Sequence, residues 1–91
     1  MEPKTLLGAV QSAWPEAAGP QVATEADPVA ERDGVVTIAC RSATWAQELD
    51  LLQRELLTRL NEVLDAHERR ATKERLRGLR FTADAARHFH S

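Results

Sequence analysis

Several residue types and segments are scarce or missing in this sequence of 91 residues. It has a single cysteine, Cys40, which excludes an internal disulfide and a cysteine-rich zinc site. No run approaches the ~18 consecutive apolar residues that indicate a membrane-spanning helix. The first residues lack the apolar segment and the cleavage site of a signal peptide. We therefore expect a cytoplasmic protein that does not enter a membrane.

The residue patterns of enzymatic sites are missing as well. The four glycines are scattered, so the sequence has neither a P-loop nor a Gly-x-Gly-x-x-Gly motif. A nucleophilic Cys40 would need a histidine held beside it, and all histidines lie in the last 25 residues. His88 and His90 supply only half of the ligands of a structural zinc ion. We expect no catalytic residue, no metal site and no cofactor, and a buried structural role for Cys40.

Charge is unevenly distributed along the chain. Residues 1–66 hold 5 Lys/Arg and 11 Asp/Glu, whereas residues 67–91 hold 7 Lys/Arg and 3 Asp/Glu. Such asymmetry is typical of a segment that faces a polyanion, although a solvated connection with compensating pairs such as Arg70 and Glu74 would give the same pattern. If the segment binds phosphates, its candidate contact residues are Arg69, Arg70, Lys73, Arg75, Arg77 and Arg80.

The first third of the sequence predicts a helix followed by a β-hairpin. Apolar residues recur at helical spacing from Pro3 to about Ala13, and Pro15 is expected to end or kink this helix. A second short helix, from Glu16 to about Ala23, is an alternative to one kinked helix. Asp-Gly at positions 33 and 34 then separates two candidate strands, residues 24–31 and 35–41, as in a hairpin.

The strongest periodicity lies in residues 43–66 and predicts one long amphipathic helix. Ser42 or Thr44 is expected to cap its start. Trp14 lies on the apolar face of the first helix, and the absence of tyrosine weakens an aromatic nucleic-acid platform as the explanation of either tryptophan. The predicted structural core comprises Trp14, Trp45, Leu49, Leu52, Leu56, Leu60 and Phe81.

A third strand is predicted at residues 76–82, after a polar stretch at residues 67–75. The fold class is therefore α+β, with an N-terminal helix, a hairpin, a long helix and a third strand forming a three-stranded sheet. The helices are expected to cover one face of the sheet and to leave the other open. Residues 1–82 form the single predicted domain, and residues 83–91 are expected to be a flexible tail. Nothing in the sequence specifies an oligomeric state.

One combination of residues resembles a known bacterial family. It includes Gly34 and Val36 in the hairpin, the run from Ser42 to Leu49 with Trp-Ala-x-Glu-Leu, the pair Leu60-Asn61, and Leu79-Arg80-Phe81 near the end. This pattern is similar to the DciA-like domain, and the resemblance covers about residues 5–82. It implies a KH-like α+β fold and a non-enzymatic role as a partner of the replicative DNA helicase and of DNA, with single-stranded DNA expected.

The sequence departs from true KH domains, because it lacks the Gly-x-x-Gly loop with which they clamp a nucleic-acid backbone. Any DNA contact would then rely on Arg and Lys against phosphates. Two alternatives stay open. The acidic first 66 residues are compatible with a protein–protein adaptor that binds no nucleic acid, and the KH-like shape alone is compatible with a small RNA-binding protein.

Overall fold

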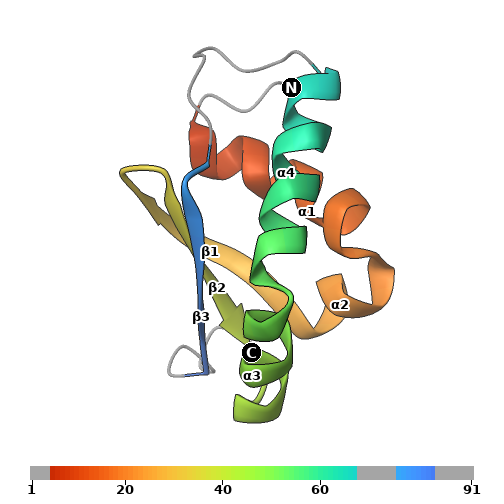
Figure 1. The fold of residues 1–91 in the computed structure, drawn as a ribbon, viewed down its shortest axis with the longest axis vertical. Helices are drawn as coiled ribbons and strands as arrows, with labels where there is room; N and C mark the ends of the chain where they lie inside the picture. The colour runs from red at the N-terminus through yellow and green to blue at the C-terminus, as the bar shows by residue number, and fades with distance from the viewer. Residues whose placement is uncertain (1–4, 68–75, 84–91) are drawn as a thin grey trace.

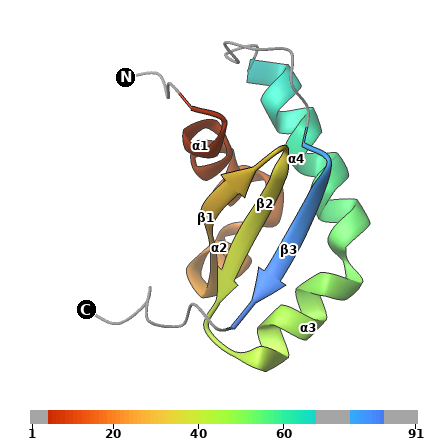
Figure 2. The ribbon, with the colours of Figure 1, turned by 90° about the vertical axis from the view of Figure 1, so that its left-hand side faces the viewer.

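The computed structural model describes residues 5–67 and 76–83, and within them it shows helices packed on one side of a three-stranded sheet (Figure 1). Viewed from its left side, the sheet lies in front and the helices lie behind it (Figure 2). The predicted α+β class is confirmed. The elements in chain order are α1 (Leu6–Ala18), α2 (Pro20–Glu25), β1 (Ala26–Arg32), β2 (Val35–Cys40), α3 (Ala43–Leu51), α4 (Gln53–His67) and β3 (Gly78–Thr82).

The sheet is mixed, with β2 in the middle. β1 pairs antiparallel with β2 as the predicted hairpin, whereas β3 pairs parallel with β2. Asp33 and Gly34 make the hairpin turn at positive φ, 53° and 85°, and the Gly34 N–H donates to the Glu31 carboxylate at 2.8 Å. The β1 register shifts between Pro28 and Ala30, which accommodates a proline in an edge strand.

The core lies between the sheet and the helices. Trp14 is its largest fully buried side chain, and its indole N–H donates to the Ala26 carbonyl at 2.8 Å. Trp45 and Phe81 are partly buried and pack against this core. The predicted core positions Trp14, Leu49, Leu56 and Leu60 are all buried. No helix in the described ranges is long and apolar enough to span a membrane.

At Pro15 the structure decides between the two alternatives that the sequence left open, because one helix continues past the proline. Helix α1 begins at Leu6 with Thr5 as its N-cap and continues through Pro15 to Ala18. Proline within a helix removes one backbone hydrogen bond and is costly. Here Trp14 and Ala17 on either side of Pro15 are buried, so packing outweighs this local cost. The expected second helix exists as α2, but it begins at Pro20 rather than at Glu16.

The prediction of one long helix over residues 43–66 is wrong. The helix is broken at Leu52, whose N–H donates to the Leu49 carbonyl at 3.0 Å. Before the break, α3 packs against β2 and β3, whereas α4 packs against α1 and β3. A single straight helix cannot satisfy both packings, so the chain bends. The prediction of Leu52 as a core residue is wrong for this reason, since its side chain is 45% exposed.

The side chain of Asn61 fixes the chain that leads into β3. Its Oδ1 accepts from the Leu76 N–H at 3.0 Å, and its Nδ2 donates to the Leu76 carbonyl at 3.3 Å. One amide thus satisfies both backbone groups of Leu76, as a neighbouring strand would. β3 begins two residues later, at Gly78 rather than at the predicted Leu76. The predicted tail at residues 83–91 lies outside the described residues except for Ala83.

Candidate functional site

The predicted phosphate-contact residues fall into two groups in the structure. Arg69, Arg70, Lys73 and Arg75 lie outside the described residues. Arg77 and Arg80 lie on the final strand or just before it, and both side chains are exposed. The Arg77 N–H donates to the Gly34 carbonyl at 2.7 Å, and the Arg77 guanidinium donates to the Asp33 carbonyl at 3.4 Å. Arg77 is therefore held against the hairpin turn.

The sheet brings a third arginine to the same surface. Arg32 pairs with Val35, and Val35 in turn pairs with Gly78, so one strand separates Arg32 from β3. Adjacent strands lie about 4.8 Å apart, which places these two backbone positions roughly 10 Å from each other. The sequence analysis missed Arg32. The Asp-Gly turn placed it at a strand end, but only the parallel pairing of β3 brings it near Arg77.

These arginines border the open face of the sheet, which no described helix covers (Figure 2). Strand alternation places Arg80 on this face together with Thr37, its partner on β2, and Ala30, the partner of Thr37 on β1. Thr37 and Ala30 have small side chains, and Ala30 is exposed. We call Arg32, Arg77 and Arg80 the basic face. It offers guanidinium groups to an anionic ligand, with Asp33 as a nearby opposing charge.

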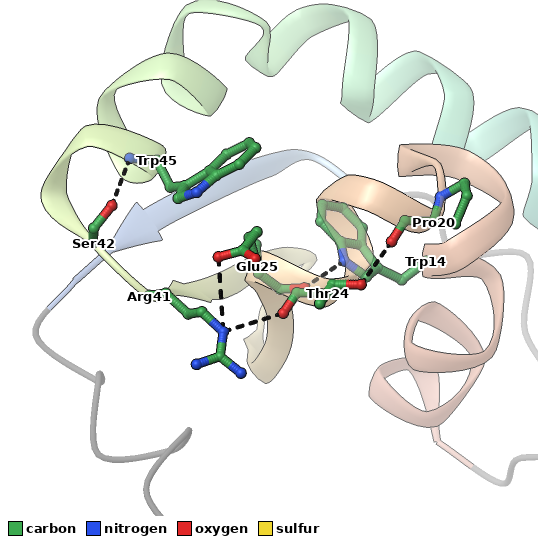
Figure 3. Close-up of polar contacts among 8 residues, drawn as sticks. Trp14, Pro20, Thr24, Glu25, Arg41, Ser42 and Trp45 are labelled. Carbon is green, nitrogen blue, oxygen red and sulfur yellow. Dashed lines mark hydrogen bonds and ion pairs between the residues drawn. The ribbon is translucent and has the colours of Figure 1, made fainter.

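A second set of polar contacts joins α2, the end of β2 and the start of α3 (Figure 3). The Arg41 Nε donates to the Thr24 carbonyl at 3.3 Å and lies 3.7 Å from the Glu25 carboxylate. The Ser42 hydroxyl caps α3 by accepting from the Trp45 N–H at 3.2 Å. These contacts are local and engage Arg41 with backbone and carboxylate oxygens. We assign them to holding the corner of the fold rather than to a ligand.

The break between α3 and α4 forms a third surface. Leu51 is 84% exposed there, next to the half-exposed Leu52. Beside them lies an open cleft of about 250 Å³ between the end of α1 and the start of α4. The Arg59 Nε spans this gap and donates to the Ala17 carbonyl at 3.0 Å. The sequence analysis missed this surface, because the leucine periodicity continues across residue 52 and conceals the break.

Residues that could carry out chemistry do not gather in the described part of the chain. There, no group of three or more His, Cys, Asp or Glu side chains could hold a metal ion. Cys40 is buried on β2, and its thiol lies 3.7 Å from the Ile38 carbonyl. Burial raises the pKa of this thiol, and a hydrogen bond with the backbone of Thr82 lowers it in part. A protonated, enclosed thiol is a poor nucleophile.

Comparison with known proteins identifies the family. The family model described as "Dna[CI] antecedent, DciA" matches residues 1–81. The chain belongs to the DciA family. The resemblance inferred from the hairpin and the Trp-Ala-x-Glu-Leu run is thus confirmed. DciA proteins are a family of helicase loaders or adaptors rather than of enzymes.

Curated relatives of this DciA-family chain are named UPF0232 proteins. One from Rhodococcus jostii is 31% identical over 58 residues, covering 64% of this chain and 31% of its own length. One from Streptomyces avermitilis is 37% identical over 65 residues, covering 69% of this chain and 36% of its own length. One from Mycobacterium tuberculosis is 36% identical over 53 residues, covering 58% and 28%. The matches thus span about a third of the length of these relatives.

Proposed function

We propose that this protein is a non-enzymatic binding module of the DciA type that engages the replicative DNA helicase and single-stranded DNA. Family membership supports the helicase part of the proposal. The DNA part is supported by the basic face, where Arg32 and Arg80 are exposed on the open side of the sheet and Arg77 is exposed beside the hairpin turn. This grouping of arginines is the single observation that carries DNA binding.

The charge of the rest of the chain supports a defined orientation on DNA. Residues 1–66 hold an excess of six acidic groups, and these repel phosphates. DNA would therefore approach the basic face, with the basic segment at residues 69–75 preceding it in the sequence, and not the helical side. Arg77 is positioned for this contact, because its backbone and its side chain are both bonded to the hairpin turn.

A titration of a fluorescent single-stranded oligonucleotide at several salt concentrations tests the DNA part. The plot of log affinity against log salt has a negative slope, and each lost phosphate contact makes that slope shallower by about 0.7. Arg77→Glu combined with Arg80→Glu is expected to make the slope shallower by about 1.4 and to weaken binding at every salt concentration. The matched control is Arg54→Glu, an exposed arginine on α4, which should leave the slope unchanged.

If the affinity of the wild-type protein for the oligonucleotide does not depend on salt concentration, the proposal of DNA binding is contradicted. The same holds if the control variant loses as much affinity as the double variant. An RNA oligonucleotide of the same sequence is titrated in parallel. Tighter binding to RNA than to DNA would favour the alternative of an RNA-binding module.

Gel filtration of the protein mixed with the purified replicative helicase of its own bacterium tests the helicase part. A complex that elutes earlier than either protein, and that persists after nuclease treatment, is the expected result. A helicase complex formed by a protein that does not bind oligonucleotides would favour the alternative of a pure protein adaptor. The exposed leucines between α3 and α4 are the observation that favours this alternative.

A further inference from the structure

The junction of α3 and α4 exposes large apolar side chains. Three large hydrophobic residues are exposed within residues 5–67 and 76–83. Two of them, Leu51 and Leu52, are adjacent and lie at this junction. Their neighbours in the stripe, Leu49 and Leu56, are buried. Adjacent exposed leucines on a small domain mark an interaction site more often than scattered single ones do. We call Leu51, Leu52 and the cleft beside them the elbow.

The elbow is held in shape by hydrogen bonds on both sides of the break. The Leu52 N–H donates to the Leu49 carbonyl at 3.0 Å, and the Leu56 N–H donates to the Leu52 carbonyl at 2.9 Å. The Gln53 side chain donates to the Asp50 carboxylate at 2.8 Å. The backbone therefore presents both leucines in a fixed geometry. A preformed surface loses less conformational entropy when a ligand binds.

The cleft of the elbow has an apolar floor and a charged rim. Its volume of about 250 Å³ exceeds that of an engineered cavity of ~150 Å³ that takes benzene, so an aliphatic side chain fits. Arg59 closes one wall through its bond to the Ala17 carbonyl. Leu52, Leu56 and Ala17 contribute apolar lining, and Glu16 and Glu55 contribute charge.

The charges around the elbow are mainly acidic. Glu48 and Asp50 precede the break, Glu55 follows it, and Glu16 lies on the opposite rim of the cleft. Two positive charges, on the exposed Arg54 and on Arg59 with its bond to a backbone carbonyl, offset these four carboxylates only in part.

The acidic rim argues against three possible occupants of the elbow. It repels phosphates, which disfavours DNA, and it repels an anionic lipid surface. A second copy related by two-fold symmetry would bring the same carboxylates face to face.

We propose that the elbow docks a basic amphipathic helix of a partner protein. The helix would place one apolar side chain in the cleft and pack a second against Leu51, at the three- or four-residue spacing of helix-in-groove recognition. Lys and Arg beside these anchors would face Glu48 and Glu55. The proposal deepens the proposed function, because the helicase is the partner named there, but its first test does not require the helicase.

The first test titrates the ¹⁵N-labelled protein with two synthetic helical peptides. Both peptides have leucine at the same positions, and their polar positions are lysine in one and glutamate in the other. The lysine peptide is expected to shift the amide signals of residues 48–56 and 16–19 and to bind at least tenfold more tightly. Equal binding of both peptides, or signal shifts centred elsewhere on the protein, would overturn the proposal.

Variants then separate the apolar contact from the charged one. Leu51→Ser is expected to weaken binding of the lysine peptide at least tenfold, with Val35→Ser, at the other exposed large hydrophobic residue, as its matched control. Glu48→Lys with Glu55→Lys is expected to do the same, with Glu62→Lys on the far part of α4 as control. Leu51 is almost fully exposed, so its substitution does not threaten folding. Loss of binding in both controls would count against the elbow.

A last measurement repeats the helicase gel filtration with Leu51→Ser. A complex with wild type that is lost with this variant places the helicase on the elbow, and an undiminished complex shows that the helicase docks elsewhere and overturns that assignment. If wild type forms no complex, the proposed helicase function fails, while the peptide titration still decides whether the elbow takes a basic helix.

Discussion

At the scale of single residues, the apolar spacing of the sequence was enough to place Trp14 in the core but not to give its polar contact. The indole ring is fully buried, and its N–H reaches the Ala26 carbonyl at the start of β1. That partner depends on how α1 crosses the sheet, which periodicity within one helix does not encode. The same limit applies to Arg32, whose proximity to Arg77 arises from strand pairing.

Cys40 gives a prediction about pH at this scale. Burial raises the pKa of its thiol above the ordinary value of 9.0. Above that pH the unfolded chain releases the thiol proton while the folded chain retains it, so the free energy of unfolding falls as pH rises past 9.0. The loss from this group is at most about 1.4 kcal/mol per pH unit. Urea unfolding of wild type and Cys40→Ala on both sides of pH 9.0 measures it.

The Cys40→Ala variant is expected to be less stable at neutral pH but to lose less stability on going to high pH. Parallel curves for the two proteins would show that the thiol does not contribute. Below pH 9.0 the thiol is protonated in both states, so the difference between the two proteins should not change there.

At the scale of elements, the sequence predicted which segments form helices and strands better than where they end. The turn at Asp33 and Gly34, the hairpin and β3 all follow from local chemistry, because positive φ and alternation are properties of a few neighbouring residues. The break at Leu52 and the continuation of α1 through Pro15 do not. Both are settled by packing against other elements, which overrides a local preference.

The Asn61 side chain gives a prediction about the link from α4 to β3. Asn61→Leu removes both hydrogen bonds to Leu76 and leaves a partly buried N–H and carbonyl without this partner. We expect a loss of roughly 1–3 kcal/mol in the free energy of unfolding. Asn61→Asp keeps the acceptor for the Leu76 N–H and should lose less. Urea unfolding measures both variants.

Glu62→Gln, at the exposed neighbouring position, is the control for Asn61 and should stay within about 0.5 kcal/mol of wild type. Equal losses for the leucine and aspartate variants would mean that the bond to the Leu76 N–H contributes little. A leucine variant as stable as wild type would remove the assigned role altogether.

At the scale of the molecule, the Arg77 end of the basic face and the elbow lie apart along α4. Leu52 precedes the first turn of α4, whereas Asn61 holds Leu76, the residue before Arg77. From Leu52 to Asn61 the helix rises about 14 Å. The sequence analysis placed positive charge near the end of the chain and so anticipated one of these surfaces. It did not anticipate the other, because an exposed leucine and a buried one are identical in a periodic pattern.

This separation predicts independent effects of substitutions at the two surfaces. Changes more than 7–10 Å apart that share no contacts usually add within about 0.5 kcal/mol. Oligonucleotide binding is measured for wild type, Leu51→Ser, the pair Arg77→Glu and Arg80→Glu, and the combination of all three changes. We expect the arginine changes to weaken binding by the same factor whether or not Leu51 is replaced. A different factor would show that the two surfaces are coupled.

The parallel pairing of β3 with β2 also bears on how the chain is made by the ribosome. Val35 pairs with Gly78, so the 37 residues at positions 41–77 are synthesised after β2 before its second edge can be filled. During that interval the nascent hairpin presents an unsatisfied strand edge rich in Val and Ile, which is a template for misassociation with other chains. Completion of the sheet must then follow release of β3 from the exit tunnel, and early termination before Gly78 would leave an aggregation-prone product.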